Sequence, residues 1–98
     1  MAKRTWKASL ETKEDLREIA LYTKEQWGIA QKNAYLKAIK IVFARLAENP
    51  VIGRQRNETA KNLFSIPARE HIVFYRYDSK HVYIVRVLHS RRDPRRAF

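Results

Sequence analysis

The chain has 98 residues, and 45% of them are hydrophobic, which is enough for a single domain spanning 1–98 with a modest core. It contains no cysteine, so disulfides, cysteine-ligated zinc and a thiol nucleophile are excluded. Twenty-one Lys and Arg against ten Asp and Glu give a net charge of +11, which favours an anionic partner over a purely solubilising role for the charge.

The chain opens with a predicted strand over residues 3–10, where apolar and polar residues alternate. Thr12 then has the character of a helix N-cap, with Asp15 as an acidic residue three positions later. The predicted helix covers residues 13–27, and Gly28 ends it. Its apolar face consists of Leu16, Ile19, Ala20, Thr23 and Trp27.

A second helix is predicted from about residue 30 to Asn49, because Pro50 prevents it from continuing. Its apolar stripe consists of Tyr35, Ala38, Ile39, Val42 and Leu46, widened by Ile41 and Phe43. The wider stripe indicates that this helix is the better buried of the two. The short link between the helices predicts an antiparallel hairpin.

The second half of the chain predicts three strands. A polar connection over residues 50–62 leads to a short strand at 63–67. Two longer strands, 71–77 and 82–88, are rich in β-branched and aromatic residues and are joined by a tight turn at 78–81. The order β-α-α-β-β-β predicts an α+β fold, in which the helical hairpin packs on one face of a small, mainly antiparallel sheet.

The two longer strands carry apolar residues on both faces. In the strand at 71–77, for example, one face holds Ile72, Phe74 and Arg76. Two helices cover only one face of a sheet, so the other face is expected to be a binding surface, unless loops or the C-terminal tail fold over it. Arg76 and Arg86 lie within strands and need a partner, for which Asp78 and Asp93 are the internal candidates.

The histidines are the first candidates for chemistry. His71 precedes one strand of the hairpin and His89 follows the other, so the two are expected near one end of the sheet. No carboxylate is placed to complete a metal site, and we expect neither a metal nor a cofactor. His89 could act in acid–base catalysis among arginines, but a strand-end histidine with a backbone partner is the alternative.

The sequence lacks the other common catalytic patterns. It has no paired catalytic carboxylates, no glycine-rich phosphate loop and no serine in a nucleophile elbow. The remaining candidates are Trp27, which also continues an apolar stripe, together with Arg54, Arg56 and Arg69. No apolar run reaches the length of a membrane span and no signal core is present, so we expect a cytoplasmic protein without a membrane partner.

Three stretches carry a resemblance to a known family. "EDLREIALYTKEQWG", "FARLAENPVIGR" and "HIVFYRYDSKHVYIVRVLHSRRD" resemble, in this order, the ParE branch of the RelE/ParE toxin superfamily. The resemblance covers nearly the whole chain and implies the β-α-α-β-β-β fold. It also implies a bacterial toxin that inhibits DNA gyrase, and an antitoxin whose acidic segment binds the toxin in a hetero-oligomer.

The other branch of this superfamily cleaves mRNA on the ribosome. Its arginine in the hairpin strand falls on Ile72 here, its final tyrosine falls on Ser90, and only His89 matches. A ribonuclease would therefore have to use His89 with Arg69 or Arg76 as substitutes. A family member that has lost its toxic activity and only binds a partner is the third reading.

The resemblance places the contact residues on the second sheet face and at the C-terminus. The predicted target- or antitoxin-binding residues are Trp27, Ile72, Phe74, Arg76, Arg91, Arg92, Arg95 and Arg96. Phe98 is expected to lie beyond the core with the last arginines. The tail arginines should matter more for toxicity than for folding, unless Arg91 or Arg92 pairs with Asp93 or Asp78 and braces the hairpin.

Overall fold

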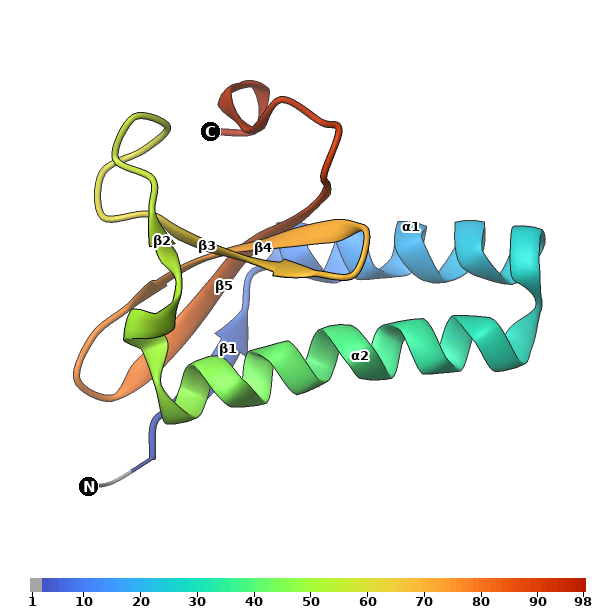
Figure 1. Cartoon of the computed structure of the whole chain (residues 1–98), viewed down its shortest axis with the longest axis horizontal. Helices are drawn as coiled ribbons and strands as arrows, with labels where there is room; N and C mark the ends of the chain where they lie inside the picture. Colours follow the sequence, from blue (N-terminus) through green and yellow to red (C-terminus); the bar gives the residue numbers. More distant parts are fainter. Residues whose placement is uncertain (1–2) are drawn as a thin grey trace.

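A computed structural model, which describes residues 3–98, has two helices packed on one face of a five-stranded sheet (Figure 1). The helices are α1 (Leu10–Trp27) and α2 (Ile29–Glu48). The strands are β1 (Thr5–Ala8), β2 (Arg54–Gln55), β3 (Phe64–Ala68), β4 (His71–Tyr77) and β5 (His81–His89). Two short 3-10 turns, Pro50–Ile52 and Pro94–Arg96, complete the structure. The predicted α+β fold is confirmed.

The sheet is mixed, with the order β1-β5-β4-β3-β2. β1 runs parallel to β5, while the other neighbours are antiparallel. The two-residue strand β2 lies in the polar connection predicted at residues 50–62, and it pairs with the first two residues of β3 at the far edge of the sheet. The mainly antiparallel character expected from the sequence is therefore correct, with one additional strand.

Gly28 forms the link between the helices by itself. Its φ of +91° lies in a region that favours glycine, and its N–H closes α1 by donating to the Lys24 carbonyl. The hairpin extends past the end of the sheet at this link (Figure 1). No helix within residues 3–98 combines the length and apolarity that crossing a bilayer requires.

The predicted N-cap of α1 is wrong. The helix begins at Leu10, and Ser9 is the cap, because its hydroxyl accepts a hydrogen bond from the Thr12 N–H at 3.0 Å. Thr12, which was predicted as the N-cap, and Asp15, which was predicted as an acidic residue of the first turn, are 0% and 7% exposed. Both side chains are turned toward β5.

Side chains at the start of α1 form hydrogen bonds with the edge of β5 that has no neighbouring strand. β1 ends at Ala8, so the edge of β5 beyond Ile84 has no neighbouring strand. The Thr12 hydroxyl donates to the Ile84 carbonyl at 2.9 Å, and the Asp15 carboxylate accepts from the Val87 N–H at 2.9 Å. Side chains of the helix therefore satisfy backbone groups that a longer β1 would have paired.

The main core lies between the helices and the sheet. Its fully buried centre consists of Ile39, Phe43, Leu46, Val73, Tyr75, Val82 and Ile84. Two large residues of the predicted apolar stripes are exposed: Ile41 is 52% exposed and Trp27 is 71% exposed. Ile41 points away because the buried face of α2 is set by Ile39, Val42 and Leu46, about 100° per residue around the helix.

Tyr75 anchors the connection after α2. Its hydroxyl donates to the Pro50 carbonyl at 2.6 Å and accepts from the Gly53 N–H at 3.0 Å. Burial raises the pKa of this phenol to about 12. A neutral, buried hydroxyl with both partners therefore holds the turn at Pro50–Ile52 against the sheet.

Candidate partner-binding surface

The second face of the sheet is covered at its centre. Phe74 and Leu88 are 1% and 2% exposed and pack with Leu63. The ring of Phe98 lies 5.4 Å from that of Phe74, centroid to centroid, so the end of the chain folds back over the sheet. The expectation of an open apolar face is therefore wrong at Phe74, while Ile72 beside it remains partly exposed.

Arg86 has a partner that the sequence did not indicate. Its Nε and Nη2 donate to the two oxygens of Asp15 at 2.8 and 2.9 Å, and both side chains are largely buried. These hydrogen bonds raise the pKa of the guanidinium further above its ordinary value. Arg86 therefore belongs to the framework that joins α1 to β5 and is not free for a ligand.

The two aspartates proposed as arginine partners have other roles. Asp78 accepts hydrogen bonds from the Lys80 and His81 N–H groups at 2.8 Å, and these lower its pKa to about 2. Asp93 caps the final turn and pairs with Arg95 at 3.1 Å. Within residues 3–98 no ion pair involves Arg91 or Arg92, so these two do not brace the hairpin.

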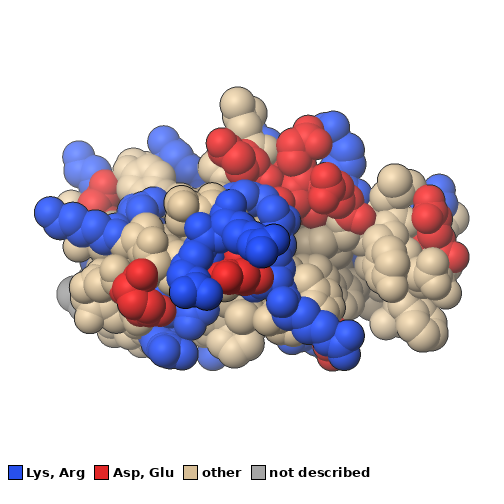
Figure 2. All heavy atoms as spheres, turned by 90° about the horizontal axis from the view of Figure 1, so that it is seen from above, with Lys and Arg blue, Asp and Glu red and all other residues tan. Residues whose placement is uncertain are grey.

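Cationic side chains gather over the covered face. Arg56 places its guanidinium 5.5 Å from the Phe74 ring centroid, and Arg76 donates from Nε to the Lys61 carbonyl at 3.2 Å. Seen from this side, Lys and Arg surround the C-terminal turn, while acidic side chains gather over α1 (Figure 2). We define the arginine face as Arg54, Arg56, Lys61, Arg76, Arg91, Arg92, Arg95 and Arg96.

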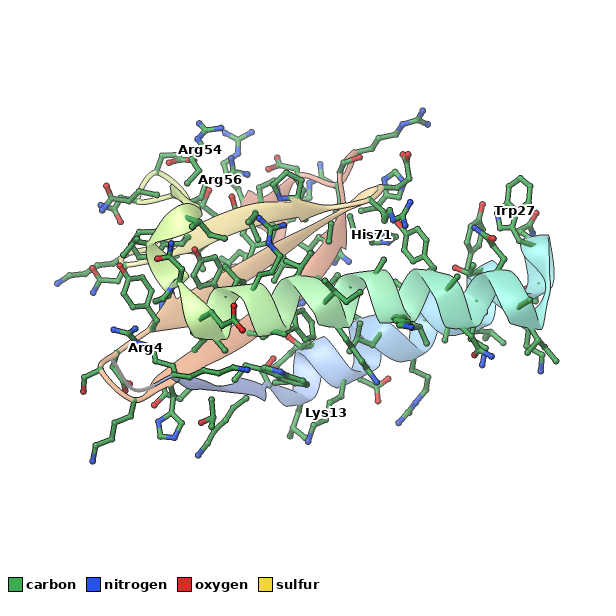
Figure 3. The ribbon with its side chains drawn as sticks, turned by 60° about the horizontal axis from the view of Figure 1, so that its bottom comes forward. Arg4, Lys13, Trp27, Arg54, Arg56 and His71 are labelled. Carbon is green, nitrogen blue, oxygen red and sulfur yellow. The ribbon has the colours of Figure 1, made fainter. Side chains whose placement is uncertain are left out.

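The arginine face and the helices lie on opposite sides of the sheet. Arg54 and Arg56 project from the side away from α2, whereas Lys13 lies on the helical side (Figure 3). Trp27 is at the tip of the helical hairpin, far from both arginines in this view. The predicted contact residues therefore do not form one patch, because Trp27 is separate from the arginines.

The expected histidine pair exists at one end of the sheet. The rings of His71 and His89 are 5.3 Å apart, centroid to centroid, and the Tyr35 hydroxyl lies 2.6 Å from His71 Nδ1. Burial, followed by the neighbouring His89, lowers the pKa of His71. Among residues 3–98, no three or more His, Asp or Glu side chains are grouped so that they could hold a metal ion.

The alternative catalytic residues are dispersed. β4 pairs His71 with His89 and Arg76 with Tyr83, so Arg76 lies five residues further along the ladder. At about 3.3 Å per residue this separates Arg76 from His89 by roughly 16 Å. Arg69 lies nearer, in the turn that joins β3 to β4. His89 and Arg76 cannot act on the same phosphate in this arrangement.

A second surface of different character lies on the helical side. Two adjoining hollows of about 490 and 440 Å³ share Ala44 of α2. Their apolar lining is Trp6, Leu36, Ile41, Ala44 and Ala47, and their cationic lining is Lys3, Arg4, Lys37 and Lys40. We call this surface the α2 groove. Ile41 was the sequence signal for the α2 groove, but the predicted apolar stripe assigned Ile41 to the core.

Comparison with known proteins agrees with this architecture. The family model described as "ParE toxin of type II toxin-antitoxin system, parDE" matches residues 7–94. Toxin ParE1 of Mycobacterium tuberculosis is 37% identical over 79 residues, covering 80% of this chain and 81% of that protein. Toxin ParE1 of Caulobacter vibrioides is 29% identical over 90 residues, covering 92% and 93%.

Solved structures share the fold at lower identity. A chain of the chromosomal ParDE system from P. aeruginosa superposes with a TM-score of 0.77 at 15% identity, covering 89% of this chain and 96% of that one. A chain of the toxin–antitoxin complex RelBE2 from M. tuberculosis gives 0.65 at 20% identity, covering 90% and 99%. Because the family model matches residues 7–94, which is most of this chain, the chain belongs to the ParE family of toxins of type II toxin–antitoxin systems.

Proposed function

We propose that this ParE-family toxin inhibits DNA gyrase and presents the arginine face to its target. The superfamily has two activities, gyrase inhibition and mRNA cleavage. The distance between His89 and Arg76 is the observation that favours gyrase inhibition. Cleavage at a 2′-hydroxyl needs a base, an acid and cationic stabilisation at one phosphate, and Arg76 lies toward the other end of the β4–β5 ladder from His89, which leaves Arg69 as the nearer cation. An inhibitor that acts by binding needs only a complementary surface, and the arginine face supplies one.

Purified protein should block supercoiling of a relaxed plasmid by gyrase without degrading RNA. Replacing Arg91 and Arg92 by alanine should weaken this inhibition by about tenfold or more, because a desolvated charged contact is worth several times a surface side chain's effect on stability. The same substitutions should change stability by only about 0.5 kcal/mol, since both side chains are exposed. Titrated supercoiling assays and thermal melting of the same variants measure the two effects.

A matched control removes the same charge from the helical side. Lys13 and Lys24 are exposed on α1, and Lys13→Ala with Lys24→Ala should leave the inhibition near wild type. Cleavage of mRNA in a ribosome-containing translation mixture, with supercoiling unaffected, would instead establish the ribonuclease alternative. Loss of both activities in a well-folded wild-type protein would identify an inactive, partner-binding member.

We also propose that a cognate antitoxin neutralises this chain by placing an acidic, amphipathic segment in the α2 groove. The family and the two toxin–antitoxin systems of similar fold support such a partner. The second sheet face, which the sequence favoured for this role, is covered at Phe74. The α2 groove keeps an exposed apolar lining beside four cationic side chains, which suits apolar anchors flanked by carboxylates.

Replacing Ile41 by aspartate should weaken antitoxin binding by about a hundredfold, because it places a negative charge on the apolar lining that faces an acidic segment. The fold should survive, since Ile41 is 52% exposed. Val51→Asp is the matched control, because Val51 is 66% exposed and does not line the groove. Calorimetric titration with the purified antitoxin measures both variants, and equal affinities would remove the groove from consideration.

A further inference from the structure

Most cations of the arginine face are not neutralised within the chain. Only two carboxylates pair with it in the part of the chain that the structure describes: Glu58, 3.7 Å from Arg56, and Asp93, 3.1 Å from Arg95. The other six members make no ion pair there, and four of them, Arg54, Arg91, Arg92 and Arg96, are exposed arginines. The face therefore has an excess of positive charge in one region (Figure 2).

Arg56 shows where an anion would be received. Its side chain is only 14% exposed and lies over the Phe74 ring, which fixes the plane of the guanidinium. Its Nε is buried and makes no hydrogen bond among the described residues, and the carboxylate that pairs with it, Glu58, is 3.7 Å away. Because this Nε is buried, an anion would meet the part of the side chain that remains exposed, where a partly desolvated guanidinium holds a charged acceptor strongly.

The apolar residues beneath the arginines are already covered. Phe74 and Leu88 are buried, and Phe98, the last cover over them, is 39% exposed. A peptide gains affinity chiefly from apolar anchors in pockets, and this face offers few. A phosphate polymer gains affinity from cations that neutralise its successive charges, and the arginine face has eight Lys and Arg residues. The surface chemistry therefore favours a nucleic acid backbone over a protein segment.

We propose that the arginine face binds the phosphate backbone of duplex DNA. The proposal rests on the proposed function in one respect: a gyrase inhibitor meets duplex DNA at its target. The tail arginines and Arg56 would contact phosphates, while among residues 3–98 only a loop and the single-turn 3-10 helix Pro94–Arg96 stand out from this side of the sheet, and neither is long enough to read a groove (Figure 1). The binding is therefore independent of base sequence.

Phosphate binding has a measurable salt signature. Each neutralised phosphate contributes about −0.9 to the slope of log K against log salt, so the four tail arginines and Arg56 predict a slope of about −4.5. The affinity should then fall by between about two and about three orders of magnitude between about 50 and about 200 mM salt. Arg91→Ala with Arg92→Ala should reduce the magnitude of the slope by about two and weaken binding by about tenfold or more.

Fluorescence anisotropy of the full chain with a labelled, random-sequence duplex tests this directly. Arg91→Lys with Arg92→Lys keeps the charge and should retain the slope, whereas Lys13→Ala with Lys24→Ala removes two charges from the helical side and should retain both slope and affinity. Arg56→Ala should reduce the slope by about one. Melting curves identify any variant that has lost its fold, and the exposed tail variants do not depend on that control.

Several outcomes would overturn the proposal. Equal weakening by the tail and α1 variants would mean that net charge, and not this face, attracts DNA. Tighter binding of an acidic polypeptide such as polyglutamate, with no measurable duplex binding, would make the face a protein-docking surface. Binding of single-stranded RNA in preference to the duplex would exclude DNA as the polymer. Gyrase inhibition without duplex binding refutes this inference alone, and duplex binding without inhibition refutes only the proposed function.

Discussion

Replacing Asp15 by alanine should lower the free energy of unfolding by about 3–5 kcal/mol. The change leaves the largely buried guanidinium of Arg86 without its bidentate partner and removes the acceptor for the Val87 N–H. Breaking one side of a buried ion pair is costly because the remaining charge stays buried and uncompensated. For a domain of this size the melting temperature should fall by about 15 °C or more.

Glu14 provides the matched control for Asp15. It is the preceding residue on α1, and its 3.0 Å pair with Arg17 is exposed on both sides. Glu14→Ala should therefore change stability by about 0.5 kcal/mol or less. Asp15→Asn, which keeps an acceptor but loses the charge, should fall between the two. Urea unfolding of the three variants would refute the bracing role of Asp15 if Asp15→Ala and Glu14→Ala were indistinguishable.

The second large effect is expected at Gly53. Its φ of −78° is open to any residue, so alanine meets no backbone strain there. A Cβ at this position would instead collide with the hydroxyl and ring of Tyr75, which is fully buried and cannot turn away. The collision also displaces the hydroxyl from its two backbone partners. Gly53→Ala should therefore cost about 2–4 kcal/mol.

A double-mutant cycle separates this collision from a general effect of losing a glycine. Tyr75→Phe should cost about 1–3 kcal/mol by itself, because it leaves the Pro50 carbonyl and the Gly53 N–H without their partner. Combined with Gly53→Ala it should cost less than the two separate losses, since the hydroxyl that the new Cβ meets is gone. Gly28→Ala, whose cost comes from its φ of +91° in open space, should add to Tyr75→Phe without coupling.

Local chemistry predicted those elements whose ends are set by their own residues. β4 lies over 71–77 as expected, because a run of β-branched and aromatic residues is bounded by turns at both ends. Gly28 ends α1 as expected, since its backbone conformation favours glycine. The two-residue strand β2 was not predictable from Arg54 and Gln55, because it is a strand only through its pairing with β3.

The errors have a common cause in long-range contacts. Thr12 and Asp15 have the spacing of an N-cap pair, but their bonds go to residues 71 or 72 positions away on β5. Phe98 follows a run of arginines, and no local pattern indicates that its ring packs on Phe74. The exposure of the tail arginines was predictable from composition, whereas the covering of the face beneath them was not.

The pairing of β1 with β5 has a consequence for synthesis of the chain. The Ser9 hydroxyl bonds the Val85 carbonyl across a separation of 76 residues, so the first strand has no neighbour until the last one leaves the ribosome. The helical hairpin needs only local contacts and can form while the rest is being made. At about 5–20 residues per second, several seconds pass between emergence of β1 and emergence of β5. The arginine face, which includes Arg91, Arg92, Arg95 and Arg96, is therefore completed only after β5 has emerged.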